Sequence, residues 1–136
     1  MALGMAGTAA RLEMYDVCAL ILLGFNVFLR TSEMLSLRSC SIFYKKSQAS
    51  LILHETKTGK RKGVDERVTV TSKLAVKALK FATRNRLKGD LVLNRSVYNF
   101  RRVFKQLLDF FELSKSDYNV CKCELGHMYC VLLAFA

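Results

Sequence analysis

An arginine that follows an apolar segment and a basic, glycine-containing turn further along the chain could together hold a phosphodiester. Arg30 follows a long apolar segment, and Glu33 lies three residues after it. Lys57 lies in Thr56-Lys57-Thr58-Gly59-Lys60, between two runs typical of strands. A guanidinium offers a planar fork that matches two phosphate oxygens, whereas an ammonium is a compact charge that can also give up a proton. Arg30 is therefore a candidate phosphate ligand, and Lys57 is a candidate proton donor.

Both residues also have a simpler interpretation, which the sequence leaves open. A charge beside an apolar segment needs a partner, and Glu33 could supply it as a salt bridge to Arg30. The same Glu33 could instead orient the guanidinium toward a phosphate. Lys57 could be an ordinary solvated lysine, although neighbouring basic residues favour a tip that contacts DNA phosphates. These neighbours are Lys60, Arg61 and Lys62.

Positive charge is concentrated in the middle of the chain. The 136 residues carry a net charge of +11. Residues 30–105 hold 19 basic and five acidic side chains, whereas residues 1–29 hold one basic and two acidic ones. A basic block within an otherwise neutral chain is typical of a protein that binds a polyanion, most commonly nucleic acid. The alternative is a basic surface that is merely solvated.

The hydrophobic periodicity predicts one α+β domain, mostly helical, with a small three-stranded antiparallel sheet at one edge. The chain is long enough for one core, since 51% of its residues are hydrophobic. Residues 1–10 are expected to be a loose leader, and residues 119–136 a divergent apolar tail. Helices are predicted over 11–29, over 32–37 with Ser32 as N-cap, over 73–85 and over 96–111. The helix over 73–85 is expected to bury one face, which carries Leu74, Ala78, Phe81 and Ala82. Strands are predicted over 40–46, 49–55 and 67–71.

The last predicted helix has two distinct faces. Its aromatic and aliphatic residues recur at helical spacing on one face, which we expect to be buried. The basic residues on the other face are Arg101, Arg102 and Lys105. These three are further candidates for contact with DNA.

The order of these motifs resembles the catalytic domain of the tyrosine recombinases, the phage-integrase type. The segment 28–37, Phe-Leu-Arg-Thr-Ser-Glu-Met-Leu-Ser-Leu, is similar to the first arginine box of that family. The segment 56–60 is similar to its lysine-bearing β-hairpin, and the later strand and helices follow in family order. The resemblance covers residues 12–118. It implies double-stranded DNA as partner, other protomers as possible partners, and DNA recombination and integration as the function.

The resemblance also implies a mechanism. In this family a tyrosine attacks a DNA phosphodiester and forms a 3′-phosphotyrosyl link, without a metal or other cofactor. Two arginines neutralise the phosphate and a lysine protonates the leaving oxygen, so the catalysis is electrostatic and general acid. Arg30 would be the first phosphate-binding arginine, Lys57 the general acid and Glu33 a supporting residue. Lys60 is the rival for the role of Lys57, although a backbone-phosphate contact suits it better.

The family pattern stops near Tyr118. The last arginine of the chain is Arg102, and no second arginine box or following nucleophilic tyrosine can be identified. Tyr118 comes too early, and Tyr129 has no box before it. We therefore expect a recombinase-like domain, incomplete at its C-terminal end through truncation, frameshift or altered splicing, that binds DNA but does not complete strand cleavage alone. The alternatives are a non-catalytic DNA-binding module, or an interaction protein that docks through its apolar C-terminus.

The remaining sequence features argue against membrane and metal classes. The apolar run Val17–Leu29 is too short to span a bilayer, and no basic region precedes it as in a signal peptide. Five irregularly spaced cysteines suit an intracellular protein, in the nucleus of a eukaryote or the cytoplasm and nucleoid of a prokaryote. The soft ligands near the C-terminus do not have the usual zinc spacing, so no metal site is expected. They are Cys121, Cys123, His127 and Cys130.

Overall fold

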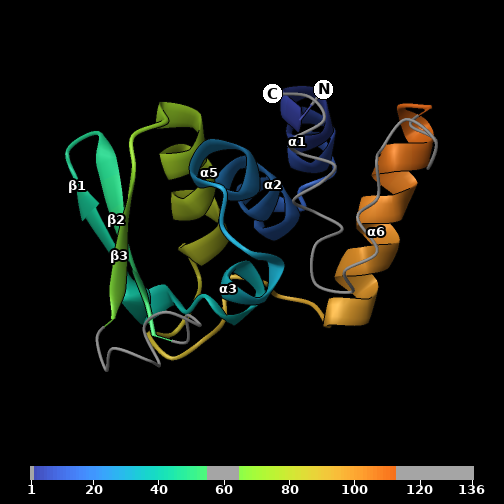
Figure 1. Cartoon of the computed structure of the whole chain (residues 1–136). Helices are drawn as coiled ribbons and strands as arrows, with labels where there is room; N and C mark the ends of the chain where they lie inside the picture. Colours follow the sequence, from blue (N-terminus) through green and yellow to red (C-terminus); the bar gives the residue numbers. More distant parts are fainter. Residues whose placement is uncertain (1, 55–64, 113–136) are drawn as a thin grey trace.

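The computed structural model describes residues 2–54 and 65–112, which form helices with a small sheet at one edge of the domain (Figure 1). In chain order the first elements are α1 (Ala2–Arg11), α2 (Tyr15–Val27), α3 (Thr31–Ser36) and a short 3-10 turn, Ser39–Ser41. The strands are β1 (Ile42–Lys45), β2 (Gln48–Leu53) and β3 (Glu66–Val70), and the last helices are α5 (Lys73–Thr83) and α6 (Val97–Phe110). The predicted α+β class, with a small antiparallel sheet, is confirmed.

Helix α2 is the centre of the core. Every residue from Asp16 to Gly24 is buried, and Leu20, Ile21 and Leu23 are completely so. Helices α1 and α5 pack against it, and β3 also contacts it. A helix that is apolar on nearly all sides must be covered on all sides, which explains why α2 has neighbours on several faces.

The sheet has the order β1-β2-β3, with both pairs antiparallel. Ile42 pairs with Leu51 at one junction, and Leu53 pairs with Glu66 at the other. Along β2, Ala49, Leu51 and Leu53 are buried while the residues between them are half-buried. This alternation gives the sheet one core face, where α2 and α5 pack.

The N-terminal segment differs from the expected loose leader, because residues 2–11 form helix α1. Ala2, Met5, Ala6 and Ala9 are buried at helical spacing. Alanine has the highest helix propensity, and small side chains allow a close approach to α2. The predicted helix over 11–29 corresponds to α2, which begins only at Tyr15, after a break at residues 12–14 that separates it from α1.

The break between α1 and α2 is a Schellman turn with an unfavourable residue in its left-handed position. The Met14 N–H donates to the Ala9 carbonyl at 2.9 Å and the Glu13 N–H donates to the Ala10 carbonyl at 3.0 Å. Glu13 has φ of 56°, where glycine is normally preferred. The backbone at Glu13 is therefore strained by its own Cβ.

Replacing Glu13 by glycine is expected to raise the free energy of unfolding by about 1 kcal/mol, because the left-handed conformation costs roughly that for a residue with a Cβ. Urea unfolding of the variant measures this. Glu13→Ala is the matched control, since it removes the same side chain and keeps the Cβ. Equal stability of the two variants would contradict the explanation.

The two last helices agree with the prediction in position but only partly in their buried faces. In α6, Phe100, Phe104 and Leu107 are buried as expected, and the Ser96 hydroxyl accepts from the Asn99 N–H at 3.2 Å. In α5 the expected inward residues Leu74 and Phe81 are 58% and 41% exposed. The buried residues there are Ala75, Val76, Ala78 and Leu79. Helix α5 is thus rotated relative to the expectation, because both α2 and the sheet pack against it.

Within residues 2–54 and 65–112, none of the helices combines the length and the apolar character needed to cross a bilayer.

Candidate nucleic-acid interface

Arg30 and Glu33 interact at the junction between α2 and α3. The Glu33 carboxylate accepts a hydrogen bond from the backbone N–H of Arg30 at 2.8 Å, which is one half of a capping box. Its other oxygen lies 3.6 Å from Nη1 of Arg30. Glu33 is only 11% exposed, whereas the Arg30 side chain is 55% exposed. The carboxylate is therefore fixed by the backbone, while the guanidinium faces solvent with most of its donors free for a ligand.

Local packing fixes this junction. Phe28, the C-cap residue that follows α2, has a left-handed conformation with φ of 52° and ψ of 37°, which turns the chain sharply. Leu29 and Met34 are 3% and 0% exposed, so both sides of Arg30 are anchored in the core. The structure begins α3 at Thr31, with Arg30 as the N-cap residue in place of the expected Ser32.

A cavity of about 450 Å³ lies beside this junction, between α3 and the end of β2. Its polar lining comes from both sides of the cavity, and includes Glu33, Ser36, Arg38 and His54. Arg38 donates from Nη1 to the Gly89 carbonyl and so ties the cavity to the loop after α5. The cavity is open and mostly apolar, and its charged lining residues are Glu33 and Arg38.

His54 closes one side of the cavity and joins the ends of β2 and β3. Its Nε2 lies 3.2 Å from the buried Ser41 hydroxyl, and its Nδ1 lies 3.1 Å from a carboxylate oxygen of Asp65. His54 and Asp65 are the described residues on either side of segment 55–64. They contact each other, and His54 lines the cavity. His54 is not evident as a site residue from the sequence, because its partners Ser41 and Asp65 lie 13 and 11 residues away.

The structure tests the other predicted site residues only in part. Lys57, Lys60, Arg61 and Lys62 lie outside the described residues, as do the candidate zinc ligands and the two C-terminal tyrosines.

The basic residues of α6 are placed, and Arg101, Arg102 and Lys105 are all exposed on the face opposite Phe100. Helix α6 packs against α1, on the other side of α2 from the sheet (Figure 1).

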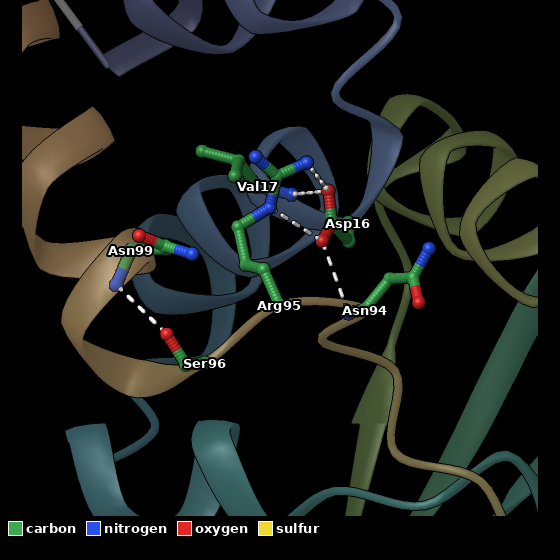
Figure 2. A network of polar contacts seen from close by, with 6 residues as sticks. All are labelled: Asp16, Val17, Asn94, Arg95, Ser96 and Asn99. Atoms are coloured by element: carbon green, nitrogen blue, oxygen red, sulfur yellow. Dashed lines mark hydrogen bonds and ion pairs between the residues drawn. The ribbon is translucent and has the colours of Figure 1, made fainter.

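A buried ion pair that the sequence did not reveal connects the start of α2 to the segment before α6 (Figure 2). Nε and Nη2 of Arg95 each donate to the Asp16 carboxylate at 2.9 Å. The backbone N–H groups of Val17 and Asn94 donate to the same carboxylate at 2.9 and 3.0 Å. Asp16 is 6% exposed and Arg95 is 26% exposed. One carboxylate thus fixes two segments that lie 79 residues apart. An acid in the first turn of an otherwise apolar helix was the only signal in the sequence.

The contacts of Asp16 make stability depend on pH. Burial by itself would raise the pKa of Asp16, but the hydrogen bonds and charge of Arg95, together with the two backbone donors, lower the pKa below its usual value. A carboxyl whose pKa is lowered on folding stabilises the protein above its unfolded pKa. That stabilisation is lost as pH falls through the folded pKa.

We therefore expect the contribution of Asp16 to stability to be complete above about pH 5 and to decline below about pH 4. Urea unfolding at a series of pH values, for the natural chain and for Asp16→Asn, isolates this contribution. The difference between the two proteins should shrink as the pH falls. A difference that stays constant from about pH 6 to about pH 3 would show that titration of Asp16 is not linked to folding.

Comparison of the chain with protein-family models, curated proteins and solved structures finds no match.

Proposed function

We propose that this chain is a duplex-DNA-binding domain of the tyrosine-recombinase type, in which Arg30 contacts a backbone phosphate. The observation that carries the proposal is that the backbone of Arg30 is fixed while its side chain is exposed. Its backbone N–H is held by the carboxylate of Glu33, which is only 11% exposed and lines an open cavity, while the Arg30 guanidinium is exposed to solvent. A guanidinium held at its base and free at its fork is suited to bidentate binding of phosphate.

The residues that flank segment 55–64 support the same proposal. His54 and Asp65 contact each other at 3.1 Å, and His54 lines the same cavity as Glu33. That segment carries Lys57, Lys60, Arg61 and Lys62. In this proposal Lys57 is the general acid of the recombinase-type site, and the other three contact neighbouring phosphates. Other protomers of the same type are further partners in the proposal.

The chain alone is proposed to bind DNA without completing strand cleavage. Residues 103–136 contain no arginine, so no second arginine box followed by a nucleophilic tyrosine can be recognised. Removing a single preorganised stabiliser of developing charge already costs about 10²–10³-fold in rate. The function proposed here is therefore the binding step of DNA recombination and integration.

Substitution of Arg30 tests the site most directly. Arg30→Ala is expected to weaken binding of a duplex oligonucleotide and to reduce the slope of log K against log salt by about 0.9, the value for one lost phosphate contact. Fluorescence anisotropy over a range of salt concentrations measures both quantities. Arg11→Ala is the matched control, because Arg11 is an exposed arginine on α1, away from the cavity.

Arg30→Lys separates a shaped phosphate site from bulk charge. Lysine keeps the positive charge but loses the fork, so the recombinase-type site predicts weaker binding for Arg30→Lys. A non-catalytic module that binds through charge alone predicts unchanged affinity. An interaction protein whose basic surface only keeps it in solution predicts no salt-dependent affinity for DNA. Either of the last two results would overturn the proposal.

A further inference from the structure

An apolar groove on the surface is not accounted for by the proposed DNA site. It has a volume of about 260 Å³ and lies between α1 and α5, with α2 at its base. Its walls include Leu3 and Gly7 from α1, and Leu74 and Phe81 from α5. Leu3, Leu74 and Phe81 are 55%, 58% and 41% exposed, so large apolar side chains surround an open groove. Clustered exposed apolar side chains of this kind mark interaction surfaces more often than isolated ones do.

Exposed basic side chains lie along one side of α5, and one of them lines the groove. Lys73 and Lys77 on α5 and Arg84 at its C-cap are four and seven residues apart, so they form one basic stripe along the helix. Lys77 itself lines the groove. Arg11, also exposed, ends α1 directly after Ala10, another lining residue. The third basic residue of α5, Lys80, turns toward β1, where its Nζ lies 5.6 Å from the centre of the Tyr44 ring.

Among the described residues, no acidic side chain lines the groove. Glu13 and Asp16 line a separate, polar hollow, which adjoins the groove at Tyr15 and Phe81. These two rings stack with centroids 5.2 Å apart. The groove therefore combines an apolar floor and walls with positive charge at its edge.

We propose that this groove binds an acidic amphipathic helix of a partner protein. An amphipathic helix places its apolar face in such a groove, and acidic residues on its flank would face the basic stripe of α5. The chain's own residues 113–136 fit this description less well. They carry two basic and two acidic side chains, and the apolar run 128–136 contains no acidic side chain. Complementary charge therefore points to a partner. The proposal does not depend on DNA binding.

Gly7 offers a way to block the groove without disturbing the fold. A Cβ added at Gly7 meets no atom within 4 Å, and replacing a glycine inside a helix favours the helix. Gly7→Phe should fill the groove, whereas Gly7→Ala should leave it open. The probe is a labelled peptide of about 16 residues, roughly 24 Å long as a helix, with leucines on one face and glutamates on the flanks. Anisotropy with the full chain measures its affinity.

We expect the peptide to bind Gly7→Phe at least about tenfold more weakly than Gly7→Ala, a difference typical of losing one well-packed anchor. Replacing the glutamates of the peptide with glutamine should also weaken binding. The pair Lys77→Gln and Arg84→Gln should do the same, whereas Arg102→Gln with Lys105→Gln on α6 should not. The Lys77 and Arg84 variants change only exposed side chains, so the test stands even if Gly7→Phe folds poorly.

Three results would overturn the proposal. Equal affinity for Gly7→Phe and Gly7→Ala would show that the peptide binds by charge alone. No binding to the natural chain would show that the groove does not accept a partner helix, including the case in which residues 113–136 cover it. A dimer of Gly7→Ala in sedimentation equilibrium that is absent for Gly7→Phe would assign the groove to a second copy of this chain.

Discussion

Asp16→Asn is expected to lower the free energy of unfolding by about 3 kcal/mol, since removing one member of a buried ion pair leaves the other charge without compensation. The Asp16 carboxylate accepts four hydrogen bonds, two from Arg95 and two from backbone N–H groups. Asparagine has the same shape, but it is neutral and has a single acceptor oxygen in place of two. The substitution therefore removes the charge and weakens the bonds while leaving packing nearly unchanged. Chemical unfolding near neutral pH measures the loss.

Asp109→Asn on α6 is the matched control, because Asp109 is exposed and only its backbone carbonyl accepts the bonds that are observed. We expect it to change stability by less than about 0.5 kcal/mol. A double-mutant cycle of Asp16→Leu with Arg95→Met measures the coupling. The double variant should be more stable than Asp16→Leu alone, since no unpaired charge remains. A loss below about 1 kcal/mol for Asp16→Asn would mean that water compensates Arg95.

Phe100→Ala is expected to destabilise the chain by about 4 kcal/mol, the middle of the range for removing a buried phenylalanine. Phe100 is 2% exposed and stacks on Phe104, with ring centroids 6.0 Å apart. Helix α6 has a strongly amphipathic sequence and contacts α1. A cavity at Phe100 therefore removes the main apolar anchor of α6. Thermal and urea unfolding both measure the effect.

Tyr98→Ala is the control for Phe100→Ala. Tyr98 lies on the same helix and is 75% exposed, so its removal should change stability by less than about 0.5 kcal/mol. Phe100→Leu should fall between the two, because leucine fills part of the space. If Phe100→Ala cost no more than Tyr98→Ala, α6 would not be held by its buried face. The basic residues Arg101, Arg102 and Lys105 would then not be held at a fixed position.

The Asp16–Arg95 pair and the buried face of α6 both help to position the candidate site. The Asp16–Arg95 pair fixes the segment that leads into α6, and the backbone N–H of Val92 in that segment donates to the Leu37 carbonyl just after α3. The same network thus connects the start of α2, the region after α3 and the start of α6. Loss of this network should weaken the DNA binding proposed above through misplacement of these elements, without removal of any phosphate contact.

Most of the elements, and much of their burial, could be predicted from the order of apolar and polar residues. Periodicities near 3.6 and 2 residues are local properties, so α2, α6 and the three strands could be located from the order of apolar residues. The pairing of Arg30 with Glu33 was predictable for the same reason, because three residues of one helix turn bring them together. The helix over residues 2–11 has alanines and Met5 at helical spacing, but the prediction of a loose leader there was wrong.

Contacts between residues that are distant in the sequence depend on how the elements pack, and they could not be predicted from local spacing. The Asp16–Arg95 pair joins residues 79 apart, and the groove between α1 and α5 exists because both helices pack on α2. The buried face of α5 was misjudged because two neighbours, α2 and the sheet, compete for it. Local spacing fixes which side chains share a face of one element. Which faces are then covered depends on how the elements pack together. This packing leaves Arg30 exposed next to Glu33, which lines a cavity, and it leaves an apolar groove open.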